Sequence, residues 1–200
     1  MKFQPRSEST RQFIIERTAG IFNVKGYAGT SLSDLTEATK LTKGSIYGNF
    51  ENKEDVALAA FDYNAANRVK AARDKISTYS SYKDKLLVYA TLYGSGANIT
   101  LPEGGCPLLN TGTEADDTNE PLRQRVAEAL LQWKNDLVDL IQQGIRANEF
   151  RADVDANRLA LSIIALIEGA ILLGKSTKNY EYMGTVIETV KEMINAIEVN

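Results

Sequence analysis

The stretch LTKGSIYGNFENK, at residues 41–53, decides the fold that we expect for this chain. Thr42 carries a hydroxyl that can accept a backbone N–H group at a helix N-terminus, and small, polar and aromatic residues follow it as far as Phe50. This pattern predicts a short, exposed helix. Just upstream, Ser31 has Asp34 three residues after it, which is the spacing of a helix cap. Two short helices about three residues apart predict a helix-turn-helix, whose second helix enters the major groove of DNA.

The longer run GYAGTSLSDLTEATKLTKGSIYGNFENKEDVALAAF, at residues 26–61, resembles the DNA-binding region of the TetR family of transcriptional repressors. The resemblance lies in the order and spacing of the glycine, threonine, Lys-Gly-Ser, Tyr-x-x-Phe and Lys-Glu elements. It implies an all-α protein in which a three-helix helix-turn-helix domain, residues 1–51, precedes a helical effector-binding and dimerisation domain, residues 52–200. It also implies three partners: double-stranded operator DNA, a small-molecule effector, and a second copy of the chain packed through the last two helices. Gly48 departs from the family pattern, where a larger residue is usual, so we expect no readout of DNA through that position.

The charge of the chain is distributed unevenly along the sequence. Residues 1–53 contain 8 Lys and Arg against 5 Asp and Glu, whereas residues 54–200 contain 15 against 21, in agreement with the net charge of −3. A mildly basic N-terminal part on an acidic body fits DNA contact through one end of the protein, because phosphate contacts need local cations. With 44% hydrophobic residues in a chain of 200, one or two soluble domains are expected.

Several classes of function are disfavoured by residue types that are missing or scarce. Histidine is absent, which excludes Ser-His and Cys-His nucleophile pairs and histidine metal sites, so an enzyme is not expected and neither is a cofactor. Cys106 is the single cysteine, which rules out an intrachain disulfide and favours a reducing cytoplasm. The polar N-terminus does not resemble a signal peptide. The longest apolar stretch, Leu159–Leu173, is too short to span a bilayer, so no membrane partner is expected.

The candidate DNA contacts gather on the second helix of the predicted pair and beside its neighbours. Lysine can pair with phosphate or read guanine, a tyrosine hydroxyl can reach phosphate, and asparagine can reach a base edge. Residues near helix N-termini gain further attraction for phosphate from the N–H groups there. The alternative is that Tyr47 packs internally and Asn49 only caps a helix. The candidates are Thr30, Thr42, Lys43, Ser45, Tyr47, Asn49 and Lys53.

The remaining helices follow from apolar spacing. A first helix is expected to run to about Lys25 and to end at Gly26, and a fourth is expected from Lys53 towards Ile76, shared by both domains and able to transmit motion between them. Near the C-terminus, a helix over residues 155–175 is apolar on most of its circumference. The last helix has an apolar stripe that we expect at the dimer interface, consistent with the family resemblance. This stripe is Met183, Val186, Ile187, Val190, Ile194 and Ile197.

An effector cavity is expected among the aromatic residues of the C-terminal part. Ligand pockets are mostly apolar with a few polar groups, and Glu168 in an apolar helix would be costly without a partner. The alternative is an ordinary core with an ion pair at the dimer interface. The candidate effector-binding residues are Tyr89, Tyr93, Cys106, Leu109, Trp133 and Glu168.

Two further features have a functional and a plain interpretation. Cys106 precedes Pro107 at the start of an expected helix, where a thiolate would gain from the helix dipole, so it is either an oxidant or electrophile sensor or a small buried hydrophobic residue. The acidic residues Glu114, Asp116 and Asp117 suggest a metal site, but a solvated loop is the favoured interpretation, so we expect no metal.

The helix-turn-helix pattern predicts a sequence-specific DNA-binding regulator, and the TetR resemblance implies a homodimeric repressor that a small molecule releases from its operator. One alternative is a helical small-molecule-binding protein that does not bind DNA. The other is a repressor that senses oxidants or electrophiles through Cys106.

Overall fold

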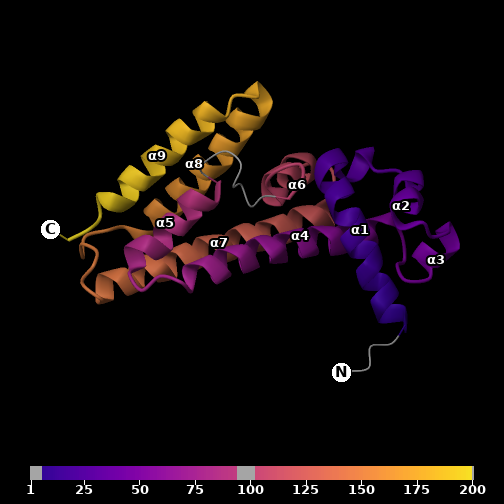
Figure 1. The fold of residues 1–200 in the computed structure, drawn as a ribbon, viewed down its shortest axis with the longest axis horizontal. Coiled ribbons are helices and arrows are strands. Elements are labelled where there is room, and N and C mark those ends of the chain that lie inside the picture. The colour runs from indigo at the N-terminus through magenta and orange to yellow at the C-terminus, as the bar shows by residue number, and fades with distance from the viewer. Residues whose placement is uncertain (1–5, 94–101, 200) are drawn as a thin grey trace. The chain divides into compact units, whose positions relative to one another are not determined.

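The computed structural model describes residues 6–93 and 102–199, and these residues form helices with no strand among them (Figure 1). A single antiparallel bridge joins Phe150 to Glu198. The expectation of an all-α fold is confirmed. The helices are α1 (Arg6–Gly29), α2 (Leu32–Thr39), α3 (Lys43–Tyr47), α4 (Lys53–Ile76), α5 (Tyr82–Tyr93), α6 (Pro107–Ala115), α7 (Glu120–Arg146), α8 (Ala156–Thr177) and α9 (Tyr180–Asn195).

The helices form two compact units. Unit 1 joins Met1–Asn67 to Pro102–Ala127, and unit 2 joins Arg68–Leu101 to Glu128–Asn200. The cuts between them fall inside α4 and α7, so each of these helices belongs partly to both units. The expected domain boundary at residue 51 stays a prediction, and unit 1 differs from it by containing α6, which packs on α1.

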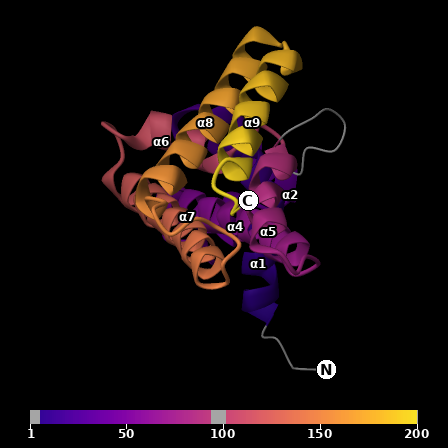
Figure 2. The same cartoon turned by 90° about the vertical axis from the view of Figure 1, so that its left-hand side faces the viewer.

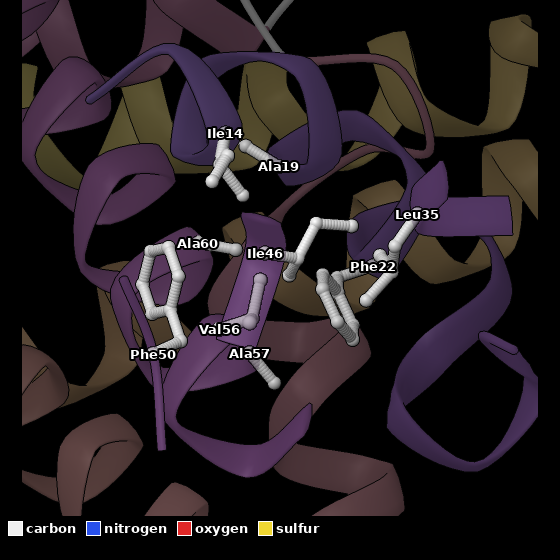
Figure 3. Close-up of a cluster of buried hydrophobic side chains, with 9 residues drawn as sticks. All are labelled: Ile14, Ala19, Phe22, Leu35, Ile46, Phe50, Val56, Ala57 and Ala60. Carbon is white, nitrogen blue, oxygen red and sulfur yellow. The ribbon is translucent and has the colours of Figure 1, made fainter. Parts of the chain in front are cut away.

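The core of unit 1 lies where four helices converge. α1 and α4 each contribute several apolar side chains, whereas α2 and α3 contribute one each, Leu35 and Ile46. Figure 3 shows the side chains from α1 and α4 facing those of the two short helices between them. Because α2 and α3 are too short to be stable alone, their shape depends on this burial. The buried cluster is Ile14, Ala19, Phe22, Leu35, Ile46, Phe50, Val56, Ala57 and Ala60.

Unit 2 is built around the pair α8 and α9, which lie side by side in both views (Figures 1 and 2). α9 also packs against α5. The apolar stripe of α9 is therefore internal: Val190 and Ile194 are fully buried. The expectation that this stripe forms the dimer interface is wrong, because the stripe is used within one chain. Other apolar side chains of the pair remain exposed, namely Leu161, Leu172, Leu173, Tyr180 and Tyr182.

By length and composition alone, α8 is apolar enough to cross a membrane, since it extends over 22 residues rather than the shorter apolar stretch noted in the sequence. Its buried residues recur along one face at helical spacing, as in the core helix of a water-soluble domain. Packing against α9 accounts for this buried face, while Leu161, Leu172 and Leu173 stay exposed on the rest of the helix.

Candidate nucleic-acid interface and ligand cavity

The helix-turn-helix is held in shape by polar caps. Ser31 caps α2 by accepting a hydrogen bond from the backbone N–H of Asp34 at 3.2 Å, and the Asp34 carboxylate accepts one from the Ser31 N–H at 2.8 Å. The Lys25 ammonium lies 2.6 Å from the same carboxylate, and together with Ser31 it holds the pKa of Asp34 well below its ordinary value. α2 ends at Lys40 in the left-handed region, with φ of 57°. The predicted capping box is confirmed.

The second helix of the pair, α3, begins at the predicted cap. The Thr42 hydroxyl accepts a hydrogen bond from the Ser45 N–H at 3.2 Å. Ile46 is its only fully buried residue, and Tyr47 packs partly buried against the same core, whereas Lys43 is exposed. Gly48 forms the C-cap rather than lying inside the helix, and therefore the usual cost of a glycine within a helix does not apply.

Five of the seven candidate DNA contacts lie on or next to α3. Thr42 and Lys43 are exposed, whereas Ser45, Tyr47 and Asn49 are half-buried. Asn49 donates a hydrogen bond from its side chain to the Ser45 carbonyl at 2.8 Å, as the capping alternative expected. The exposed face of α3 thus offers a cation and hydroxyl groups, which suits phosphate and base-edge contacts.

The other two candidates, Thr30 and Lys53, are engaged inside the protein. Thr30 is 1% exposed and its hydroxyl donates to the Gly26 carbonyl at 2.6 Å. The Lys53 ammonium donates to the carbonyls of Tyr27 at 2.8 Å and Thr30 at 3.0 Å, and it lies 4.3 Å from the centre of the Tyr27 ring. These contacts give both residues a role in the link between α1 and α2, so their contact with phosphate stays a prediction.

Arg11 supports the interface although its sequence context did not reveal it. Its guanidinium donates to the Asn49 carbonyl at 2.5 Å, pairs with Asp55 at 3.2 Å and lies 3.9 Å above the Phe50 ring. It therefore fixes the connection between α3 and α4. These partners are 38 and 44 residues away in the chain, so no local pattern could have identified them.

Unit 2 contains a cavity of about 270 Å³ between α4, α5 and α7. Trp133 and Tyr89 form part of its wall, with ring centres 6.3 Å apart, and the Arg68 guanidinium lies 4.1 Å above the Trp133 ring. Burial raises the pKa of Tyr89 to about 12, with a further increase from Asp136 that Arg68 and Arg73 oppose. The phenol is therefore a neutral hydrogen-bond donor at physiological pH.

Only part of the predicted effector set meets at this cavity. Tyr89 and Trp133 line it, but Glu168, on α8, does not, and Cys106 and Leu109 belong to unit 1. Tyr89 and Trp133 therefore share this cavity, and the role of the other candidates in effector binding stays a prediction. The Tyr93 side chain lies outside the described residues.

The cavity also has polar lining residues that no pattern in the sequence indicates. Arg68 and Arg73 on α4, and Asp136 on α7, have the spacing of ordinary charged residues on long helices. Only the tertiary structure shows that all three line the same cavity.

Cys106, Asp116 and Asp117 fit their plainer interpretations, whereas Glu114 lies in helix α6 rather than in a solvated loop. Cys106 is fully buried at the start of α6, as expected of a small hydrophobic residue. Asp116 and Asp117 are exposed, while Glu114 accepts hydrogen bonds from the backbone of α1. Within residues 6–93 and 102–199, no group of three or more Cys, Asp or Glu side chains is arranged to hold a metal ion.

A capped two-helix pair on a buried core, with an outward-facing second helix, defines a helix-turn-helix DNA-binding protein. Comparison with known proteins supports this class. Residues 14–60 match the family described as "Bacterial regulatory proteins, tetR family", and residues 83–190 match "Tetracyclin repressor-like, C-terminal domain". The chain belongs to the TetR family of transcriptional regulators, as the resemblance at residues 26–61 implied.

Individual relatives can be aligned with nearly the whole length of this chain. The crystal structure of a TetR-family regulator from Cytophaga hutchinsonii is 55% identical, covers 100% of both chains and has a TM-score of 0.96. A TetR regulator from Chloroflexus aurantiacus J-10-FL is 37% identical, covers 98% of this chain and 99% of its own, and has a TM-score of 0.91. The HTH-type transcriptional repressor DhaR of Mycobacterium sp. (strain GP1) is 26% identical over 92% of this chain and 91% of its own length.

Proposed function

We propose that this regulator is a homodimeric repressor that a small molecule releases from its operator by binding the cavity of unit 2. The observation that carries this proposal is the shared use of α4. The same helix supplies Val56 and Ala60 to the core beneath the helix-turn-helix, and Arg68 and Ala72 to the cavity wall. A ligand that shifts α4 therefore changes the population of the state that fits successive major grooves. The protein acts in the cytoplasm by binding rather than by turnover.

The chemistry of the cavity supports a small aromatic ligand with an anionic group. Arg68 is 6% exposed and Tyr89 is 5% exposed, so the buried part of the wall offers a cation, a neutral phenol donor and aromatic rings. Asp136 is half-buried and Asp139 is exposed, which places the acidic groups closer to solvent. A carboxylate that reaches Arg68 and Tyr89 would form charge-assisted hydrogen bonds, while its ring would lie against Trp133.

The dimer is proposed to form through α8 and α9 by the apolar side chains that one chain leaves exposed. Leu172 and Leu173 lie on α8 at 52% and 45% exposure, and Tyr180 and Tyr182 begin α9 at 54% and 51%. A second copy that covers this surface would remove large apolar groups from water, which is the usual driving force for a homodimer.

The ligand proposal is tested with 2-naphthoate and its uncharged analogue 2-naphthamide. Trp133 is the only tryptophan in the chain, so intrinsic fluorescence reports directly on the cavity wall. We expect naphthoate to change this fluorescence and to release a duplex taken from the chain's own upstream region, and naphthamide to bind about tenfold more weakly or worse.

The matched variants are Arg68→Met, which removes the buried cation, and Arg146→Met, which removes an exposed arginine of α7 outside the cavity. We expect only the first to lose naphthoate binding. Equal binding of naphthoate and naphthamide would refute the ligand class. Binding of naphthoate without any change in operator affinity would refute release through this cavity.

A further inference from the structure

The last turn of α1 is separated from the rest of the helix by Gly26. This residue has φ of 74° and ψ of 176°, a conformation that interrupts a helix and strongly favours glycine. A helical turn that restarts after such a break has N–H groups without acceptors in its own helix. Those of Tyr27 and Ala28 donate to the two oxygens of the Glu114 carboxylate, each at 2.8 Å. A side chain of α6 therefore caps a turn of α1.

The opposite end of this turn is held by a cation. The Lys53 ammonium, from α4, donates to the carbonyls of Tyr27 and Thr30 at 2.8 and 3.0 Å. An anion at the start of a helical turn and a cation at its end both complement the direction of the peptide dipoles. Ser31, the N-cap of α2, follows at once, so the position of this turn sets where the helix-turn-helix begins.

Gly26 and Glu114 are matched sterically as well as by hydrogen bonds. A Cβ atom on residue 26 would overlap the Glu114 carboxylate, and would lie 2.8 Å from its Cδ atom. Because Gly26 has no side chain, the Glu114 carboxylate can lie directly against the backbone of α1. A larger residue would have to displace Glu114.

The start of α6 is attached to α1 by a second set of hydrogen bonds. Asn23 donates from its side chain to the carbonyls of Glu103 at 2.6 Å and Gly105 at 3.0 Å. Asn110 donates from its side chain to the Asn23 carbonyl at 3.0 Å and to that of Gly104 at 2.8 Å. α6 is therefore fixed along the end of α1 at both ends, as its place beside α1 in Figure 1 illustrates.

We propose that Glu114 is a positioning residue for DNA recognition. Its carboxylate holds the Tyr27–Ala28 turn in the one place from which α2 and α3 present the reading face to operator DNA. The residue does not contact DNA, and its role goes beyond the repressor function proposed above. Movement of α6 along α1 would withdraw the carboxylate and loosen the start of the helix-turn-helix.

The main test uses Glu114→Gln, which keeps the size of the side chain. An amide has one acceptor oxygen, so the second backbone N–H would face an NH2 group and lose its partner. We expect faster hydrogen exchange at the Tyr27 and Ala28 amides and a roughly tenfold or greater loss of operator affinity. Affinity for a random-sequence duplex should stay within about threefold of wild type, because non-specific binding depends on charge rather than on exact placement.

Two further variants separate positioning from charge and from general loss of structure. Asp117→Ala removes one negative charge from an exposed position three residues further along the chain, and should leave exchange and operator affinity unchanged. Gly26→Ala displaces the same carboxylate from the side of α1. The loss of operator affinity in the double variant should therefore be smaller than the sum of the losses, in free energy, of the two single variants. Wild-type operator affinity in Glu114→Gln, with the helical circular dichroism of the parent, would overturn the proposal. So would an equal loss of affinity for operator and random DNA.

Discussion

The pairs α2–α3 and α8–α9 have similar connections but different sources of stability. In each pair the first helix ends at a lysine in the left-handed region, Lys40 with φ of 57° and Lys178 with φ of 54°. In each the second helix begins with a polar cap, Thr42 or Asn179. Yet α3 has 5 residues with one of them buried, whereas α9 has 16 with four buried.

This difference separates a recognition element from a structural one. A helix as short as α3 gains little from its own backbone hydrogen bonds, so caps and one anchor decide its orientation. α8 and α9 instead bury a continuous apolar stripe, and the area removed from water dominates their stability. In the pair α2–α3, the polar face of α3 therefore stays exposed and available for contact with DNA.

The largest expected effect is that of Val190→Asp in α9. Val190 is fully buried, with 0% solvent exposure, so the variant would bury an unpaired carboxylate. We expect a loss of about 3 kcal/mol or more in the free energy of unfolding, measured by urea denaturation. Thr189→Asp, at the exposed neighbouring position, is the control and should change stability little. A wild-type urea midpoint for Val190→Asp would show that the stripe does not hold the pair together.

The next effect concerns the exposed surface of the same pair. Leu172→Glu places a charge where a second copy is proposed to pack, and should weaken dimerisation roughly tenfold or more without unfolding the chain. Sedimentation over a range of concentrations measures the dissociation constant. Leu131→Glu changes an equally exposed leucine on α7 and should leave it unaltered. Equal dissociation constants for the two variants would place the interface elsewhere.

Removal of the two matched caps compares the pairs directly. Thr42→Ala and Asn179→Ala should each cost about 1 kcal/mol of stability, because each leaves a backbone N–H at a helix start without its side-chain acceptor. Only Thr42→Ala should also weaken operator binding, measured by fluorescence anisotropy. If both caps affected operator binding to the same degree, the division between recognition and structural pairs would be incorrect.

The smallest effect is expected at the surface of α3. Lys43→Ala removes an exposed cation, and should reduce the slope of log affinity against log salt concentration by about 1. Lys40→Ala, at the end of α2, shows whether any exposed lysine nearby has the same effect. An unchanged salt slope for Lys43→Ala would remove this residue from the interface.

The sequence predicted the parts of the molecule whose causes are local. The caps at Ser31 and Thr42 act over three residues, and the resemblance at residues 26–61 identified the family from order and spacing alone. Apolar spacing likewise predicted which face of α9 is buried. It did not predict what covers that face, because the same stripe fits a neighbour in the chain or a second copy.

The sequence by itself therefore determined the helices and the helix-turn-helix, since caps and helical periodicity are encoded within a few residues, and the resemblance at residues 26–61 gave the class of function. Only the tertiary structure decided how these elements are held. Glu114 meets the amide of Ala28 across 86 residues, Arg11 meets Asn49 across 38, and the cavity joins side chains of α4, α5 and α7. Such contacts depend on packing between distant helices, where an acidic residue in a loop-like stretch can become the cap of another helix.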